Sequence, residues 1–198
     1  MKNEALIAAQ KAFEIEAAEI VRAKEVMDWD VFAKAVEALA KAERIGTAGC
    51  GHSGICCMHF AHSLCCVERP ARFISPAEAV HGAMGFIQKG DVMVLASRGG
   101  KTAELIPIMS IARTKGATII SVTEKMDSPL AQGSDIVIPM RVDLETDKYN
   151  SQSTSSFVAL ASVFDALQTA LIEETGFVNE QFALTHPGGA VGERLNKK

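Results

Sequence analysis

The chain has 198 residues, 48% of them hydrophobic and 22% charged, which is enough for one well-buried domain and tight for two. Its net charge is -4 and its basic residues are scattered, which argues against a nucleic-acid surface. Aromatic residues make up only 6%, too few for the stacking platforms that bind single-stranded nucleic acid.

The first 43 residues predict two helices. They are rich in Ala, Glu and Lys and carry apolar residues at helical spacing, such as Leu6 and Phe13. Asp28 or Asp30 is expected to cap the second helix, because short acidic side chains accept hydrogen bonds from the first free backbone N–H groups. We expect both helices to pack outside the main domain or to be exchanged with a partner.

The remainder, residues 44–198, alternates short apolar runs with helical segments. The runs rich in Val and Ile lie at 44–49, 71–75, 91–97, 117–123 and 135–140. The helical segments include 102–116 and a long apolar helix from about 155 to 174. Such alternation implies a parallel sheet with helices on both faces. We therefore predict a single α/β domain over 1–198, a doubly wound five-stranded parallel sheet preceded by two N-terminal helices.

The cysteines suggest a reducing compartment. Their number is odd, none form a C-x-x-C motif and no signal peptide opens the chain, so we predict free thiols in the cytoplasm. Four of them fall in the segment "ICCMHFAHSLCC", residues 55–66, where Cys/His pairs have ligand-like spacings. Buried helix cysteines are favoured over a metal site, and no metal is predicted. No apolar run is judged long enough to span a membrane, so no membrane partner is predicted either.

Two glycine-rich stretches follow predicted strands, "GCGHSG" at 49–54 and "SRGGKT" at 97–102. Ligands of doubly wound sheets bind beyond the carboxyl ends of the strands. Glycines let backbone N–H groups approach an anion, and the helix N-termini that follow favour negative charge. We predict that these loops bind a phosphate group, although two ordinary turns remain an alternative. The side chains expected to contact the phosphate are Ser53, Ser97, Arg98 and Thr102, and Lys101 can add a further charge.

The first stretch is also close to the dinucleotide motif G-x-G-x-x-G. That interpretation requires an acidic residue about twenty positions later, at the end of the next strand, to bind the ribose. The next predicted strand instead ends in Ser75 and Pro76, with Glu78 just beyond it. NAD binding is therefore not favoured, and no cofactor is predicted.

Three titratable residues lie outside the glycine loops. His81 falls between two predicted strands, Glu145 precedes the long helix amid several hydroxyls, and His186 precedes a Pro-Gly-Gly turn. Each histidine alone is more often a turn or surface residue than a catalyst. Beside phosphate-binding loops, however, such groups can move protons between adjacent carbons of a sugar.

At this point the sequence resembles a known family. The stretches "GCGHSG", "SRGGKTAEL", "TSS" before a long helix and "FALTHPGGAVGERL", in this order, resemble the sugar isomerase (SIS) domain family. More narrowly, they are similar to its arabinose-5-phosphate isomerase branch, the KpsF/GutQ family, over residues 30–195. The resemblance implies a five-stranded parallel sheet and a homo-oligomer, dimer or tetramer, whose sites lie near subunit interfaces. Branch members often carry two CBS domains after the SIS domain, and we expect none in this chain.

The resemblance also implies roles for individual residues. Glu145 and His186 match the family's groups for proton transfer through an enediol, and His81 matches a histidine of the "Glu-Ala-x-His-Gly" stretch. The family's phosphate-binding hydroxyls match Ser53, Ser97 and Thr102. The further substrate-binding residues that we predict are Gly51, His52, Lys101, Thr154 and Ser155.

Two positions depart from the branch pattern. The branch has lysine where this chain has His52, and it has Ser-Gly-Glu where this chain has Gly99-Gly100-Lys101. The charge pattern of the site is therefore rearranged, and the identity of the sugar stays open. The sequence favours a phosphosugar aldose–ketose isomerase, because binding a phosphate alone does not require His81, Glu145 and His186. The alternative is a non-catalytic regulatory protein that binds a phosphosugar.

Overall fold

Five parallel strands form the centre of the computed structural model, which describes residues 2–196. In chain order they are β1 (Ile45–Gly49), β2 (Ala71–Phe73), β3 (Val92–Ala96), β4 (Thr118–Thr123) and β5 (Ile136–Pro139). Their order across the sheet is β2-β1-β3-β4-β5. The register pairs Gly49 with Ala96, so the carboxyl ends of β1 and β3 lie side by side. The predicted five-stranded doubly wound sheet is confirmed.

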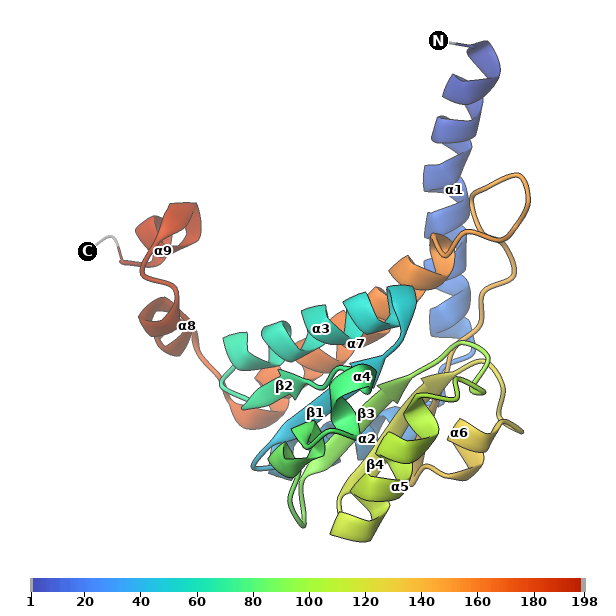
Figure 1. Ribbon diagram of the computed structural model, residues 1–198. Helices are drawn as coiled ribbons and strands as arrows, with labels where there is room; N and C mark the ends of the chain where they lie inside the picture. Colours follow the sequence, from blue (N-terminus) through green and yellow to red (C-terminus); the bar gives the residue numbers. More distant parts are fainter. Residues whose placement is uncertain (1, 197–198) are drawn as a thin grey trace.

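Helices cover both faces of this sheet (Figure 1). One face carries α2 (Trp29–Lys41), α3 (Gly51–Cys66) and α7 (Ser155–Thr175), and α1 (Asn3–Glu25) lies against α7. The other carries α4 (Pro76–Ala79), the 3-10 turn η1 (Ala83–Phe86), α5 (Leu105–Lys115) and α6 (Pro129–Gln132). The last helices, α8 (Asn179–Thr185) and α9 (Gly189–Asn196), stand away from the sheet.

The strand sequences explain the two layers. In β3, Val92, Val94 and Ala96 join the cluster formed with α2, α3 and α7, whereas Met93 and Leu95 join the cluster formed with α5. Because successive strand residues point to opposite faces, a fully apolar strand can serve two cores at once.

The direction of the helices after β1 and β3 locates a crevice. Helix α3 leaves β1 toward one face of the sheet, while α5 leaves β3 toward the other. The two loops therefore diverge between neighbouring strands, at the topological switch point where doubly wound folds bind ligands. These loops are the two glycine-rich stretches.

Helix α7 is long and apolar enough, by length and composition alone, to cross a membrane. The expectation that no run reaches that length does not hold for this segment. In the fold, however, α7 packs against α1, α2 and α3 and buries residues such as Phe164 and Leu167. It is thus the central helix of the larger core.

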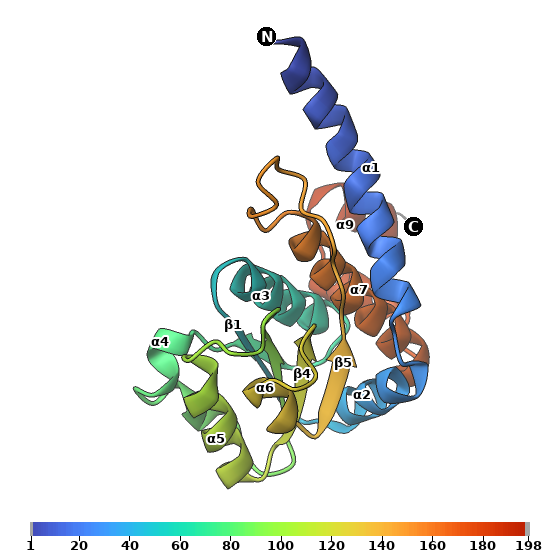
Figure 2. The same cartoon turned by 90° about the vertical axis from the view of Figure 1, so that its right-hand side faces the viewer.

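The predicted N-terminal helices are both present, and Asp28 rather than Asp30 caps the second. The Asp28 carboxylate accepts hydrogen bonds from the backbone N–H groups of Asp30 at 3.0 Å and Val31 at 3.1 Å. The first half of α1 projects beyond the rest of the molecule (Figure 2), and residues 3–11 are all exposed.

Candidate functional site

The loop between β1 and α3 is shaped by its glycines. Gly51 has a φ of +55°, in the left-handed region that favours glycine. A Cβ atom on Gly54 would lie 2.6 Å from the carbonyl oxygen of Gly49, so these two glycines let the helix start press against the strand end. His52 and Ser53 consequently stand in the first turn of α3, where the N-terminal N–H groups favour an anion.

The loop between β3 and α5 is held by its hydroxyls. Ser97 Oγ and Thr102 Oγ1 lie 2.8 Å apart, and the Gly100 N–H donates to Ser97 Oγ at 3.1 Å. Gly100 has a φ of +63°, and a Cβ atom there would overlap the side chain of Ser128. The structure thus brings together two of the predicted phosphate-binding hydroxyls, with the exposed Lys101 between them in sequence.

A pocket of about 430 Å³ opens at this edge of the sheet, beside the start of α3. Its lining includes Gly49, Cys50 and Gly51, and also Glu104, which the sequence analysis did not single out. Burial raises the pKa of the Cys50 thiol, and the negative charge of Glu104 raises it further. Glu104 lies within the "SRGGKTAEL" stretch. The sequence feature that could have identified it is an acidic residue just after a predicted phosphate loop and just before a helix.

Glu145 is buried at the N-terminus of α7. Its Oε2 atom accepts hydrogen bonds from the Thr154 N–H at 2.9 Å, the Thr154 hydroxyl at 3.1 Å and the Ser156 N–H at 3.1 Å. Burial raises the pKa of this carboxyl, but the donors from Ser156 and Thr154 together outweigh burial, and the pKa lies below its usual value. Glu145 is therefore ionised at neutral pH.

The Arg98 side chain bonds to the other oxygen of Glu145. Its Nη1 lies 2.7 Å from Glu145 Oε1, its Nε 2.9 Å from Glu124 Oε1, and its Nη2 donates to the Val142 carbonyl at 2.7 Å. The structure thus gives the guanidinium a different set of partners from the phosphate predicted for it. Glu124, the second carboxylate of this group, was also not singled out from the sequence.

Other predicted residues gather around the start of α7. The His52 ring stands edge-on to Phe157, with 6.0 Å between ring centroids, so α3 and the first turn of α7 meet there. Thr154 binds Glu145 as described above. Ser155 is fully buried, and its hydroxyl has no hydrogen-bond partner among residues 2–196.

The other two predicted histidines, His81 and His186, lie elsewhere. His186 stacks on Phe182, with ring centroids 3.8 Å apart, and its Nε2 is 3.7 Å from Cys66 Sγ. Cys66 ends α3, a 16-residue helix whose other end forms the glycine loop, about 24 Å away at 1.5 Å per residue. One chain therefore does not bring His186 to Glu145. His81 is exposed in the turn between α4 and η1.

The cysteine-rich helix behaves as a core element. Cys56 and Cys57 are buried, and burial raises the pKa of Cys56 to about 12. Within the described part of the chain, no group of three or more His, Cys, Asp or Glu side chains could hold a metal ion.

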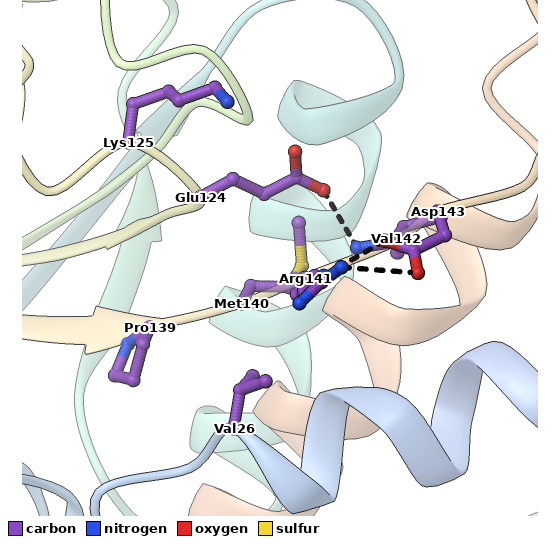
Figure 3. A pocket seen from close by; sticks show the side chains of 8 residues that line it. All are labelled: Val26, Glu124, Lys125, Pro139, Met140, Arg141, Val142 and Asp143. Carbon is purple, nitrogen blue, oxygen red and sulfur yellow. Dashed lines mark hydrogen bonds and ion pairs between the residues drawn. The ribbon is translucent and has the colours of Figure 1, made fainter.

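A second depression, of about 640 Å³, lies behind Glu124 (Figure 3). Its lining combines two acids and two bases with apolar side chains: Val26, Glu124, Lys125, Pro139, Met140, Arg141, Val142 and Asp143. Arg141 is paired with Asp143 at 2.8 Å. Glu124 accepts a hydrogen bond from the Val142 N–H at 2.8 Å, which ties the end of β4 to the segment that leads to Glu145.

Comparison with known proteins finds one family whose pattern matches this chain and curated relatives that are similar to it. The pattern of the SIS domain matches residues 38–170. Arabinose 5-phosphate isomerase KdsD of Pseudomonas aeruginosa is 40% identical over 167 residues, which are 84% of this chain and 51% of that protein. The chain thus spans about half the length of this curated relative.

Two solved structures are also similar. A putative sugar-phosphate isomerase from Listeria monocytogenes superposes with a TM-score of 0.91 at 39% identity, covering 95% of this chain and 100% of that one. The Escherichia coli CFT073 protein c3406, in complex with A5P, superposes with a TM-score of 0.84 at 30% identity, covering 94% and 100%.

Proposed function

Because the chain belongs to the SIS domain family, we propose that it is a sugar-phosphate isomerase that interconverts an aldose and a ketose. The observation that carries the proposal is the buried, ionised Glu145 at the start of α7, on the same edge of the sheet as the two glycine-rich loops that we predict to bind an anion. Relatives named arabinose 5-phosphate isomerases and a similar structure in complex with A5P support this substrate class.

The phosphate group would bind between the two glycine loops. Ser97 and Thr102 offer adjacent hydroxyls, and Ser53 offers a third at the N-terminus of α3. Lys101 supplies a positive charge on the same edge of the sheet. Anchoring the phosphate in this way fixes the sugar carbons relative to the start of α7.

The chemistry requires one proton to move between neighbouring carbons. Glu145 accepts the proton from the carbon next to the carbonyl, giving an enediol, and returns it to the former carbonyl carbon. The hydroxyl proton must also move between the oxygens of these two sugar carbons, and this transfer needs a second acid–base group. Glu104, in the wall of the pocket, and His52, beside the start of α7, are within the same region of the fold.

We assign His186 to the site of a neighbouring subunit. Its position near the far end of α3 excludes it from the site of its own chain, while the tail of α8 and α9 projects from the body (Figure 1). The protein would thus be a homo-oligomer with sites completed in trans, and the exposed His81 is a second group that such contacts can recruit. The free thiols of the five cysteines suit a cytoplasmic enzyme.

The test uses two variants and their mixture. The protein is incubated in deuterated water with pentose and hexose phosphates, beginning with arabinose 5-phosphate, and conversion and deuterium uptake at carbon are followed by NMR. Glu145→Gln and His186→Ala should each abolish turnover. After co-refolding, hybrid assemblies should regain part of the activity, because some sites then combine an intact Glu145 with an intact His186.

Binding of a phosphosugar without exchange in the wild type would overturn the isomerase and favour the regulatory alternative. His52 and Lys101, where the branch pattern has lysine and glutamate, are the residues that favour that alternative. Absence of recovery in the mixture would overturn the assignment of His186 to a neighbouring subunit, and retained turnover in His186→Ala would place His186 outside the site.

A further inference from the structure

Arg98 stands between two carboxylates on the side of the sheet edge that faces the 141–145 segment. Its side chain is 39% exposed, whereas those of Glu124 and Glu145 are 13% and 3% exposed. Glu124 Oε1 accepts a hydrogen bond from Arg98 Nε. The same atom accepts one from the Val142 N–H (Figure 3), so it fixes the guanidinium and the neighbouring backbone together. Charge-assisted bonds of this kind are about twice as strong as neutral ones.

We propose that Arg98 and Glu124 are positioning residues that hold Glu145 in its reactive orientation. The inference rests on the proposed function, in which Glu145 moves the carbon-bound proton. It assigns to Arg98 a role distinct from binding the substrate phosphate, and it gives Glu124 a role through Arg98.

The backbone of Arg98 explains why its side chain is directed this way. Its carbonyl accepts hydrogen bonds from the Glu124 N–H at 3.0 Å and from the Thr123 hydroxyl at 3.1 Å. These bonds fix the residue to the end of β4. The neighbouring Ser97 hydroxyl bonds to Thr102 and Gly100 instead. Successive side chains at this strand end therefore serve the phosphate loop and the Glu145 group separately.

The carboxylate is held at both oxygens. Oε2 has three donors from Thr154 and Ser156, while Oε1 has the single partner Arg98 among residues 2–196. Each carboxylate oxygen has about two acceptor positions, so Oε1 keeps one for a proton from the substrate. Without Arg98, that oxygen would lose both its orientation and its positive neighbour.

The titratable and charged groups in the region of Glu145 come from several elements. They are Arg98 after β3, Glu124 after β4, Arg141 and Asp143 after β5, Glu19 and Arg22 of α1, and His52 of α3. Of these, Arg98 forms an ion pair with Glu145 directly. Among these charged groups, Arg98 is the one whose removal should change the pH response of Glu145 most directly, in addition to the effect of the Thr154 and Ser156 donors.

The experiment compares Arg98→Met with Arg98→Lys, Glu124→Gln and the control Arg141→Met. Arg141 is an arginine of the same region that pairs with Asp143 rather than Glu145. The kcat of Arg98→Met should fall about tenfold to a hundredfold, as for a misplaced catalytic group. The substrate KM and the inhibition constant of inorganic phosphate should stay within about twofold, and Arg98→Lys should recover part of kcat.

The pH–rate profile gives a signature that a merely structural role would not produce. Removing the positive charge in Arg98→Met raises the pKa of Glu145, so the acid limb should move up by about one pH unit. Glu124→Gln leaves Arg98 with Glu145 as its single carboxylate partner. The acid limb of this variant's pH–rate profile should therefore move to lower pH. Arg141→Met should leave the limb in place.

A rise in KM and in the phosphate inhibition constant at unchanged kcat would overturn the proposal and make Arg98 a phosphate ligand. Carboxyl 13C NMR of Glu145 provides a readout without turnover. An unchanged Glu145 pKa in Arg98→Met, or in Glu124→Gln if Arg98→Met does not fold, also overturns it. If the wild type isomerises no sugar, but the pKa of Glu145 is higher in Arg98→Met than in the wild type, the Arg98–Glu145 link is supported and the proposed function alone is rejected.

Discussion

At the scale of single residues, Glu145 combines burial with a negative charge. Such a group is tolerated only when its charge is compensated, and here Arg98 and the donors of Thr154 and Ser156 provide the compensation. The same contacts tie a catalytic candidate to the stability of the fold.

The pH dependence of stability follows from the direction of the Glu145 pKa. The folded value lies below the usual 4.5. The stabilisation is therefore fully present above about pH 4.5 and is lost as the pH falls through the folded pKa. Urea unfolding of wild type and Glu145→Gln, compared from pH 7 to pH 3, should show a difference that shrinks in this acid range. A constant difference would contradict the prediction.

Two loop glycines form a matched pair for a second prediction. Both have positive φ, but a Cβ atom meets nothing within 4 Å at Gly51, whereas at Gly100 it overlaps Ser128. Gly51→Ala should cost about 1–2 kcal/mol of unfolding free energy from backbone strain. Gly100→Ala should cost about 3 kcal/mol, because overpacking is added. If urea unfolding shows equal losses of unfolding free energy for the two variants, the Ser128 side chain moves aside at no measurable cost.

Some of these contacts could be predicted from the sequence and others could not. It paired Ser97 with Thr102 in one loop, because glycines and hydroxyls after a strand are a local signal. It could not tell that the next side chain, Arg98, turns toward Glu124, because that depends on backbone bonds to β4. The distance between His186 and Glu145 likewise depends on where α8 stands, which local periodicity does not contain.

At the scale of elements, every predicted strand is present. Runs of Val and Ile bounded by turns are strong signals for buried parallel strands, and β3 and β4 match theirs closely. The four-residue helices α4 and α6 were not predicted, since one turn has no periodicity to detect. Their starts at Pro76 and Pro129 are explained afterwards by proline's fixed φ.

The cap of α2 allows a prediction at this scale. Asp28 accepts two backbone hydrogen bonds, whereas Asp30 lies within the helix. Asp28→Ala should lower stability by about 1 kcal/mol. Asp30→Ala, which removes a charge near the helix N-terminus without removing the cap, should cost about 0.3–0.5 kcal/mol. Thermal unfolding followed by circular dichroism measures both, and the reverse order would assign the cap to Asp30.

At the scale of the whole molecule, the free half of α1 requires an explanation. Residues 3–11 are exposed on all sides, and Phe13 is 79% exposed. Helices of this length draw most of their stability from packing. The proposed homo-oligomer would cover this half of α1, and the covered contact would then explain why the segment is helical.

Phe13→Glu should therefore reduce the size of the assembly, because it introduces a charge into that contact. Light scattering after size-exclusion chromatography measures the mass directly. Glu14→Gln changes the neighbouring residue on the same helix and should leave the mass unchanged. If both variants keep the wild-type mass, α1 lies outside the subunit contact.

The position of α7 has a consequence for how the protein is made. Helices α1, α2 and α3 all pack on α7, yet α7 is completed only at Thr175. During synthesis, therefore, the first 66 residues emerge from the ribosome before the helix they pack against exists. The parts of these three helices that contact α7 stay uncovered over more than a hundred codons, at the stage when nascent chains aggregate. Chaperones that bind nascent apolar segments should accordingly engage this chain until α7 has emerged.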